Sequence, residues 1–146
     1  MDILMVLSKV LITETGDLQL IELAERDGSR SFPIRIGITE ALAIDRRLKG
    51  VRFARPLTHD LLAMTIEALG GHLERIVVND LRDVMIGGDP RSTFFAQLHV
   101  RQGDQLITID ARPSDAIALG VASDTPIFVA EHVLDAVTRS SPGDEI

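Results

Sequence analysis

The residues from Ile109 to Gly120, which read IDARPSDAIALG, mark the place where a strand gives way to a helix. An alternating apolar run over 106–109 ends before Pro113, whose fixed φ cannot continue a strand. Ser114 and Asp115 are good acceptors for the free N–H groups of a first helical turn. The Ala/Ile/Leu run behind them predicts a narrow helix that packs close to a sheet.

This turn also concentrates charge. It carries Arg112 and Ser114 between the carboxylates Asp110 and Asp115. Charged groups at a strand end beside a helix N-terminus are what an α/β protein offers a ligand. An alternative stays open, in which Ser114 or Asp115 only caps the helix and Arg112 only pairs with Asp110.

Composition limits the classes of protein to which the chain can belong. Its 146 residues suit one domain, with 45% apolar and 25% charged residues, as is ordinary for a globular protein. The absence of cysteine excludes disulfides, a thiolate nucleophile and a cysteine zinc site. No stretch approaches the roughly 20 apolar residues of a membrane helix. Residues 1–12 lack the features of a signal peptide, so we expect a cytoplasmic location and no membrane partner.

Charge is distributed unevenly along the chain. The net charge of −7 opposes nonspecific binding of nucleic acid by the whole surface. A basic cluster nevertheless predicts a local nucleic-acid-binding patch formed by Arg46, Arg47, Lys49 and Arg52. The alternative is a solvated helix end with its cations near the C-terminal dipole. With no Trp or Tyr and five Phe, a platform that stacks successive bases is improbable.

Periodicity and turn signals predict an α+β fold with a mixed, largely antiparallel sheet and three to four helices in one compact domain over 1–137. The first three strands should form an antiparallel meander. A Gly-Gly-Asp-Pro sequence at 87–90 predicts a loop, and the polar residues 138–146 predict a disordered tail. We expect strands at 3–13, 18–25, 32–36, 73–81, 94–100, 105–110 and 126–129, and helices at 39–48, 59–69, 114–120 and 131–137.

Two helix starts in the sequence resemble each other. Residues 55–60 read RPLTHD, with Thr58 as the expected N-cap, and residues 112–115 read RPSD. Each combines Arg-Pro with a hydroxyl residue and an Asp. Each could offer an anion a guanidinium, a hydroxyl and free N–H groups, with the Asp available as a base or metal ligand. The alternative is that both are simply good helix-start sequences.

His59 is the titratable residue of most interest. At the first turn of a helix the positive end of the dipole favours neutral imidazole, which can act as a general base. The alternative interpretation is an ordinary surface histidine. The other histidines have no metal-ligand spacing with it.

Over about residues 1–137 the chain resembles the bifunctional nuclease family. The most specific matching stretch is 110–119, and the others are Ile36-Gly37, Glu40-Ala41, Arg55-Pro56, 58–61, Leu69-Gly70, 77–83, 94–96 and 126–129. The resemblance implies an α+β fold, hydrolysis of both DNA and RNA, and a wedge-like homodimer whose groove is the active site. The chain departs from the pattern at 85–93, where an added loop could cover or reshape the groove, and at Phe95, where the family often has Tyr.

On this basis one hypothesis is a nuclease that acts on DNA or RNA. Arg55 and Arg112 would hold the phosphate and His59 would activate water, with Ser114 as a further ligand for the anion. Asp60, Asp115 and Glu40 would either bind Mg²⁺ or Mn²⁺ or orient His59. The basic cluster would follow the nucleic-acid backbone.

Two other hypotheses stay open. The first is a non-catalytic binding or regulatory homodimer, in which the Arg, Asp and His residues form a structural or interfacial network. The second is an enzyme for a small phosphorylated or carboxylated metabolite, which would use the same anion site without the basic cluster.

Overall fold

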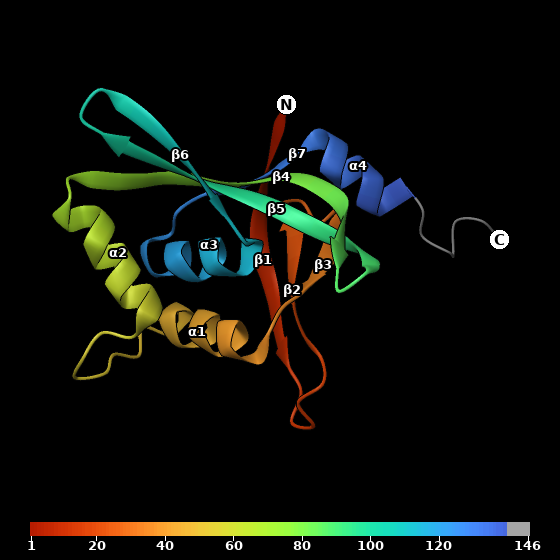
Figure 1. Ribbon diagram of the computed structural model, residues 1–146, viewed down its shortest axis with the longest axis horizontal. Helices are drawn as coiled ribbons and strands as arrows, with labels where there is room; N and C mark the ends of the chain where they lie inside the picture. The colour runs from red at the N-terminus through yellow and green to blue at the C-terminus, as the bar shows by residue number, and fades with distance from the viewer. Residues whose placement is uncertain (140–146) are drawn as a thin grey trace.

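The computed structural model describes residues 1–139, which form a seven-stranded sheet with four α-helices and a short 3₁₀ helix (Figure 1). The strand order across the sheet is β3-β2-β1-β7-β4-β5-β6. The strands are β1 (Asp2–Ile12), β2 (Gln19–Glu25), β3 (Ser31–Arg35), β4 (Gly71–Ile86), β5 (Asp89–Gln102), β6 (Gln105–Ala111) and β7 (Ile127–Ala130). The helices are α1 (Ile38–Leu48), α2 (Thr58–Ala68), α3 (Pro113–Gly120) and α4 (Glu131–Arg139), and the 3₁₀ helix is Val121–Ser123.

The predicted fold class is confirmed. Every neighbouring pair of strands is antiparallel except β4 and β7, which are parallel. The first three strands form the expected meander. Of the predicted tail at 138–146, the first two residues close α4, and 140–146 lie outside the described residues. Within residues 1–139 no helix is long and apolar enough to cross a membrane.

The core lies between one face of the sheet and the helices α1 and α3, which pack side by side against it (Figure 1). Ile76 and Val78 of β4 are fully buried beneath α3. The close approach depends on Gly120, because a Cβ at this position would lie 2.5 Å from Ile76 Cδ1. The predicted narrow helix thus packs directly on the sheet, and its N-terminus projects at the end of β6.

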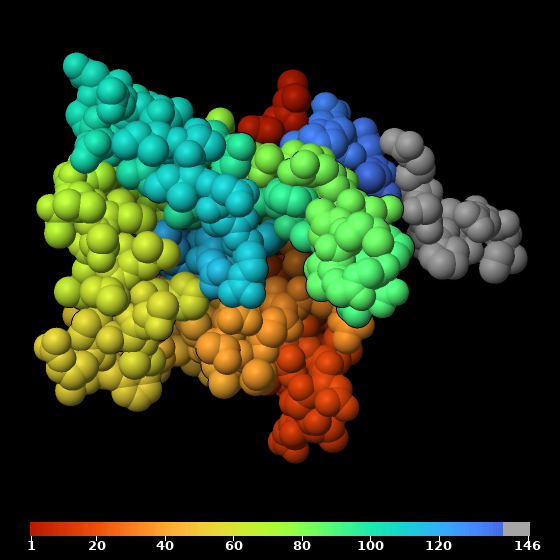
Figure 2. Space-filling view, in the orientation of Figure 1, coloured from red at the N-terminus to blue at the C-terminus, as the bar shows by residue number. Residues whose placement is uncertain are grey.

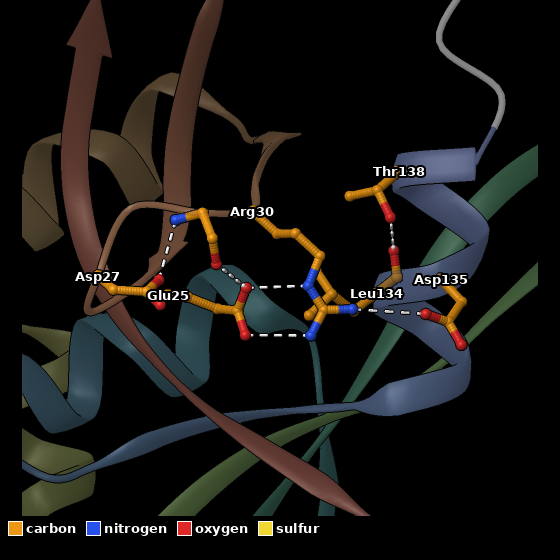
Figure 3. Close-up of polar contacts among 7 residues, drawn as sticks. Glu25, Asp27, Arg30, Leu134, Asp135 and Thr138 are labelled. Carbon is orange, nitrogen blue, oxygen red and sulfur yellow. Dashed lines mark hydrogen bonds and ion pairs between the residues drawn. The ribbon is translucent and has the colours of Figure 1, made fainter. Parts of the chain in front are cut away.

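Helix α4 is fastened to the β2–β3 hairpin by Arg30 (Figure 3). The guanidinium donates to both oxygens of Glu25, at 2.9 and 3.0 Å, and to Asp135 of α4 at 3.4 Å. Hydrogen bonds from Arg30 and Ser29 lower the pKa of Glu25 to about 2. A stack of Phe32 on Phe94, with 5.6 Å between ring centroids, joins β3 to β5 on the same side of the molecule.

The prediction of a loop at 87–90 is wrong in its extent. Strands β4 and β5 continue until only Gly87 and Gly88 separate them, both with positive φ, at 61° and 86°. Two consecutive positive φ values are typical of a tight hairpin turn and favour glycine at both positions. Residues 85–93 therefore form the end of a hairpin whose strands pair as far as Ile86 and Asp89.

Candidate functional site

The two Arg-Pro helix starts meet in space. His59 lies in the first turn of α2 and Asp115 in the first turn of α3, 56 positions further along the chain. The imidazole Nε2 lies 3.0 Å from Asp115 Oδ1. Each residue is positioned by the first turn of its helix.

Arg112 completes this contact from the other side. Its Nε donates to Asp115 Oδ2 at 2.8 Å, and its Nη2 lies 3.4 Å from Glu40 Oε2. Burial raises the pKa of Asp115, but the hydrogen bonds from Arg112 and His59 outweigh it and hold that pKa below its ordinary value. Asp115 is therefore an ionised acceptor near neutral pH, and the proton between it and His59 belongs on Nε2.

Glu40 reaches this cluster because of a glycine. It lies in the first turn of α1, and its carboxylate folds back over Gly37, where a Cβ would overlap its oxygen. The Glu40 side chain is 17% exposed, whereas that of Arg112 is 64% exposed. The guanidinium thus lies at the surface, between the less exposed carboxylates of Glu40 and Asp115. Within the described residues it does not pair with Asp110 as the alternative interpretation proposed.

Asp60 takes no part in the contact between His59 and Asp115. Its carboxylate accepts from the backbone N–H of Leu57 at 3.0 Å, from Arg46 at 3.2 Å, and from Arg47. Leu57, not Thr58, is the N-cap residue of α2, and its side chain has no acceptor. Asp60 therefore satisfies the helix start, and these bonds lower its pKa despite the opposing effect of burial.

The basic cluster separates into two kinds of cation. Arg47 is 9% exposed and donates to two backbone carbonyl groups of α3, Ala118 at 2.7 Å and Leu119 at 3.2 Å. Together with its contact to Asp60, this ties α1 to the end of α3 and the start of α2. Arg46 is 12% exposed and donates to the carbonyl of Val51 at 3.2 Å. The guanidinium groups of Arg46 and Arg47 therefore mostly bind partners within the protein.

The remaining cations lie at the surface. Lys49 pairs with Asp45 at 3.0 Å and is 65% exposed. Arg52 and Arg55 are exposed on the connection between α1 and α2, and neither has an ion-pair partner within residues 1–139. Arg55 does not join the contact between the two helix starts.

Ser114 is also separate from this contact. It is 6% exposed and lines a second hollow of about 620 Å³ beside β3. Ser92 and Thr93, from the lengthened hairpin, line the same hollow. Within the described chain, the hairpin residues 85–93 are absent from the lining of the larger groove beside His59, so the added residues do not cover it.

That groove is the largest hollow described, at about 1340 Å³, and it lies between α1, α2, β6 and the start of α3. In Figure 2, α2 and the α1–α2 connection, in yellow, lie on one side of α3 in blue, and β6 in cyan lies on the other. His59, Glu40, Arg112 and Asp115 line it, but most of its lining is apolar. Exposed apolar side chains come from every wall except α3, namely Leu42, Val51, Phe53, Leu57, Leu61, Leu62 and Ile109.

Sequence reasoning missed this apolar wall. The only signals were Leu42 beside the buried face of its helix and Phe53 within a polar connection. Each is consistent with an ordinary exposed apolar residue, and such residues are common on surfaces. Only the packing of the helices shows that these side chains line the same groove.

The described residues do not fit the divalent cation that the sequence suggested. Within 1–139 there is no group of three His, Asp or Glu side chains that could hold a metal ion. Asp115 and Glu40 share Arg112, and Asp60 is taken by two other arginines and a backbone N–H. Mg²⁺ favours carboxylate oxygens in octahedral geometry, and here both oxygens of Asp60 and both oxygens of Asp115 already accept hydrogen bonds.

One family model and two proteins of Mycobacterium tuberculosis match this chain. The sequence model described as "Bifunctional nuclease domain" matches residues 21–141. Uncharacterized proteins from two strains of Mycobacterium tuberculosis, CDC 1551 / Oshkosh and ATCC 25618 / H37Rv, are each 41% identical to the chain over 125 residues. Each alignment covers 86% of this chain and 70% of the mycobacterial protein.

Proposed function

We propose that this chain, which belongs to the bifunctional nuclease domain family, hydrolyses phosphodiester bonds of DNA or RNA in the groove where α2 and α3 begin. The observation that carries the proposal is the contact of His59 with Asp115 at 3.0 Å, beside an exposed guanidinium, in an open groove. A base, its orienting carboxylate and a cation are the parts that such a hydrolysis needs.

In this proposal His59 is the general base. Asp115 accepts a hydrogen bond from Nε2–H of His59 and so leaves Nδ1 as the acceptor nitrogen. Nδ1 takes a proton from the attacking water as its oxygen bonds to phosphorus. The bond to the leaving oxygen then breaks, and that oxygen takes a proton from the solvent or from the imidazolium.

Arg112 holds the phosphate. Its side chain is 64% exposed, and its ion pair with Glu40, at 3.4 Å, is longer than its bond to Asp115, at 2.8 Å. A phosphate oxygen can therefore replace the Glu40 carboxylate while the bond to Asp115 stays. Arginine suits this task because its planar donors match a phosphate in bidentate fashion. Arg55 is exposed on the adjoining connection and remains a proposed second phosphate contact, together with Arg52 and Lys49.

A cleavage assay tests the proposal. Purified wild type, His59→Ala and Asp115→Asn are compared on a labelled oligonucleotide, with and without chelator, and His72→Ala serves as a matched control because His72 is exposed on β4 outside the groove. Loss of a general base reduces rates by about 10²–10⁴-fold. Cleavage that persists equally in all proteins would trace the activity to a contaminant.

A second candidate function is a non-catalytic binding homodimer. The apolar lining of the groove favours it, and so does the pairing of every carboxylate at the two helix starts with an arginine. In that case Arg112 and Asp115 hold helices in place, and their loss destabilises the fold. Thermal unfolding of Arg112→Ala and Asp115→Ala separates the cases, because a functional site tolerates the change or gains stability.

We also propose a homodimer, and it is supported by α2. This helix has no fully buried residue, and its Leu61 and Met64 are 56% and 54% exposed, Leu61 at the edge of the groove and Met64 outside its lining. Such a stripe is typical of an interaction surface. Light scattering of wild type and Met64→Glu tests this assembly, and cell fractionation tests the cytoplasmic location that the proposal retains.

A further inference from the structure

The apolar groove beside His59 and Arg112 restricts the kind of nucleic acid that can bind. Phe53, Leu57, Leu62 and Ile109 are each between 39% and 58% exposed, and all face this one hollow. A large patch of this kind beside a polar cluster is typical of a binding site for a partly apolar ligand. A ligand cleaved at a phosphate must therefore bring an apolar surface with it.

Charge supplies the second part of the argument. Duplex binding by contact with the backbone depends on many free cations, since each phosphate contact releases counterions. In this chain Arg46 and Arg47 are tied to Asp60, and Lys49 to Asp45. Within residues 1–139 this leaves Arg52 and Arg55 as the cations of this segment without an ion-pair partner. The acids and bases of the groove lining nearly balance, with Glu40, Asp45, Asp110 and Asp115 against Arg46, Lys49 and Arg112. Backbone electrostatics alone therefore offer little affinity here.

We infer that the groove takes an unpaired nucleobase, so that the substrate is single-stranded nucleic acid. In a duplex the apolar faces of the bases are stacked on one another, and only polar edges reach the grooves. An unpaired base exposes its faces and can lie on apolar or aromatic side chains. The inference rests on the proposed function for the cleavage step, and binding can be measured without it.

Phe53 is the centre of this proposed base site. This residue is 58% exposed, and the guanidinium of Arg46 lies 5.6 Å from its ring centroid. Arg46 is itself held by Asp60 and the carbonyl of Val51, so the ring and the guanidinium form a fixed pair. A base could stack on this pair while Arg112 holds the adjoining phosphate.

Fluorescence anisotropy tests the inference with a labelled twelve-nucleotide mixed-sequence DNA, supplied as a single strand and as a duplex, on the His59→Ala protein. We expect the single strand to bind on the order of tenfold more tightly. The salt slope should be about −1 where Arg112 alone contacts phosphate, and about −3 where Arg55, Arg52 and Lys49 also do. Adding Phe53→Ala or Leu62→Ala should weaken single-strand binding about tenfold. Adding Met85→Ala is the matched control, since Met85 is 68% exposed at the far hairpin.

Equal binding of duplex and single strand, or single-strand binding unchanged by both groove substitutions, would overturn the inference. The cleavage assay on wild type is read separately. Single-strand binding with these variant effects but without cleavage would contradict the nuclease proposal and leave the base site standing. Cleavage of the duplex as fast as the single strand would support the nuclease and remove the base site.

Discussion

His59 and Asp60 are neighbours in sequence, yet their side chains serve different parts of the molecule. His59 lies 3.0 Å from Asp115 in the open groove, and Asp60 accepts the Leu57 N–H at 3.0 Å while it binds two arginines. The first turn of α2 is thus fixed to α3 directly on one side and through Arg47 on the other. This division separates residues expected to act on substrate from residues expected to hold the site together.

Asp60→Asn should destabilise the protein. The amide is neutral, so it weakens the contacts with Arg46 and Arg47 and the cap on α2. Loss of a helix cap costs about 0.5–2 kcal/mol. Urea denaturation followed by circular dichroism measures the change, with Asp83→Asn, an exposed aspartate of β4, as the control. A variant as stable as wild type would show that these contacts contribute nothing.

Arg47→Lys should be nearly as damaging as Arg47→Ala. A single ammonium cannot reproduce the guanidinium's reach to the carbonyls of Ala118 and Leu119 as well as to Asp60. Breaking a hydrogen bond that involves a charged group costs about 1.5–3 kcal/mol. Arg52→Ala, at an exposed position, should stay within about 0.5 kcal/mol of wild type. Full stability of the lysine variant would contradict the tying role given to Arg47.

Arg112→Ala should reduce cleavage far more than stability. Its side chain is 64% exposed, and exposed ion pairs contribute about 0–1 kcal/mol. If it holds the phosphate, kcat/KM should fall by about 10²-fold or more. A thermal scan and an oligonucleotide assay on the same preparation measure both effects. The contradicting result is a large loss of stability together with a cleavage rate that falls only as much as the fraction of folded protein. It would support the alternative in which Arg112 holds the helices in place.

The contact of Glu25 with Arg30 should make stability depend on acid pH. The pKa of Glu25 is lowered from an ordinary value near 4.5 to about 2, so its contribution is present above about 4.5 and is lost as pH falls toward 2. Glu25→Gln should therefore be less stable than wild type at pH 6, and the difference should shrink between pH 4.5 and 2. A difference independent of pH would contradict this assignment.

Local sequence chemistry predicted much of the fold. The passage from β6 through Arg112 to α3 was predicted from Pro113 and the Ala-rich run, and the alternating apolar residues gave the meander. The hairpin at 87–88 was misjudged because Gly-Gly-Asp-Pro is typical of loops, while the pairing of its flanking strands comes from residues on both sides.

The site was predicted only in part, because its partners are distant in sequence. The hypothesis that Asp115 orients His59 required the two residues to be close, and they lie 3.0 Å apart. Nothing local distinguishes Arg47, whose carbonyl partners lie 71 and 72 positions away, from the exposed Arg52. Whether each arginine is buried and paired depends on how α1 packs on α3, and this packing cannot be inferred from the local sequence.

The most direct measurement of the central claim is a double-mutant comparison of cleavage rates for His59→Ala, Asp115→Asn and the combined variant, with folded fractions matched by thermal unfolding. Because the two side chains act as one unit in this account, the combined variant should be no slower than the slower single variant. Rate losses that multiply, or single variants that cleave as fast as wild type, would contradict it.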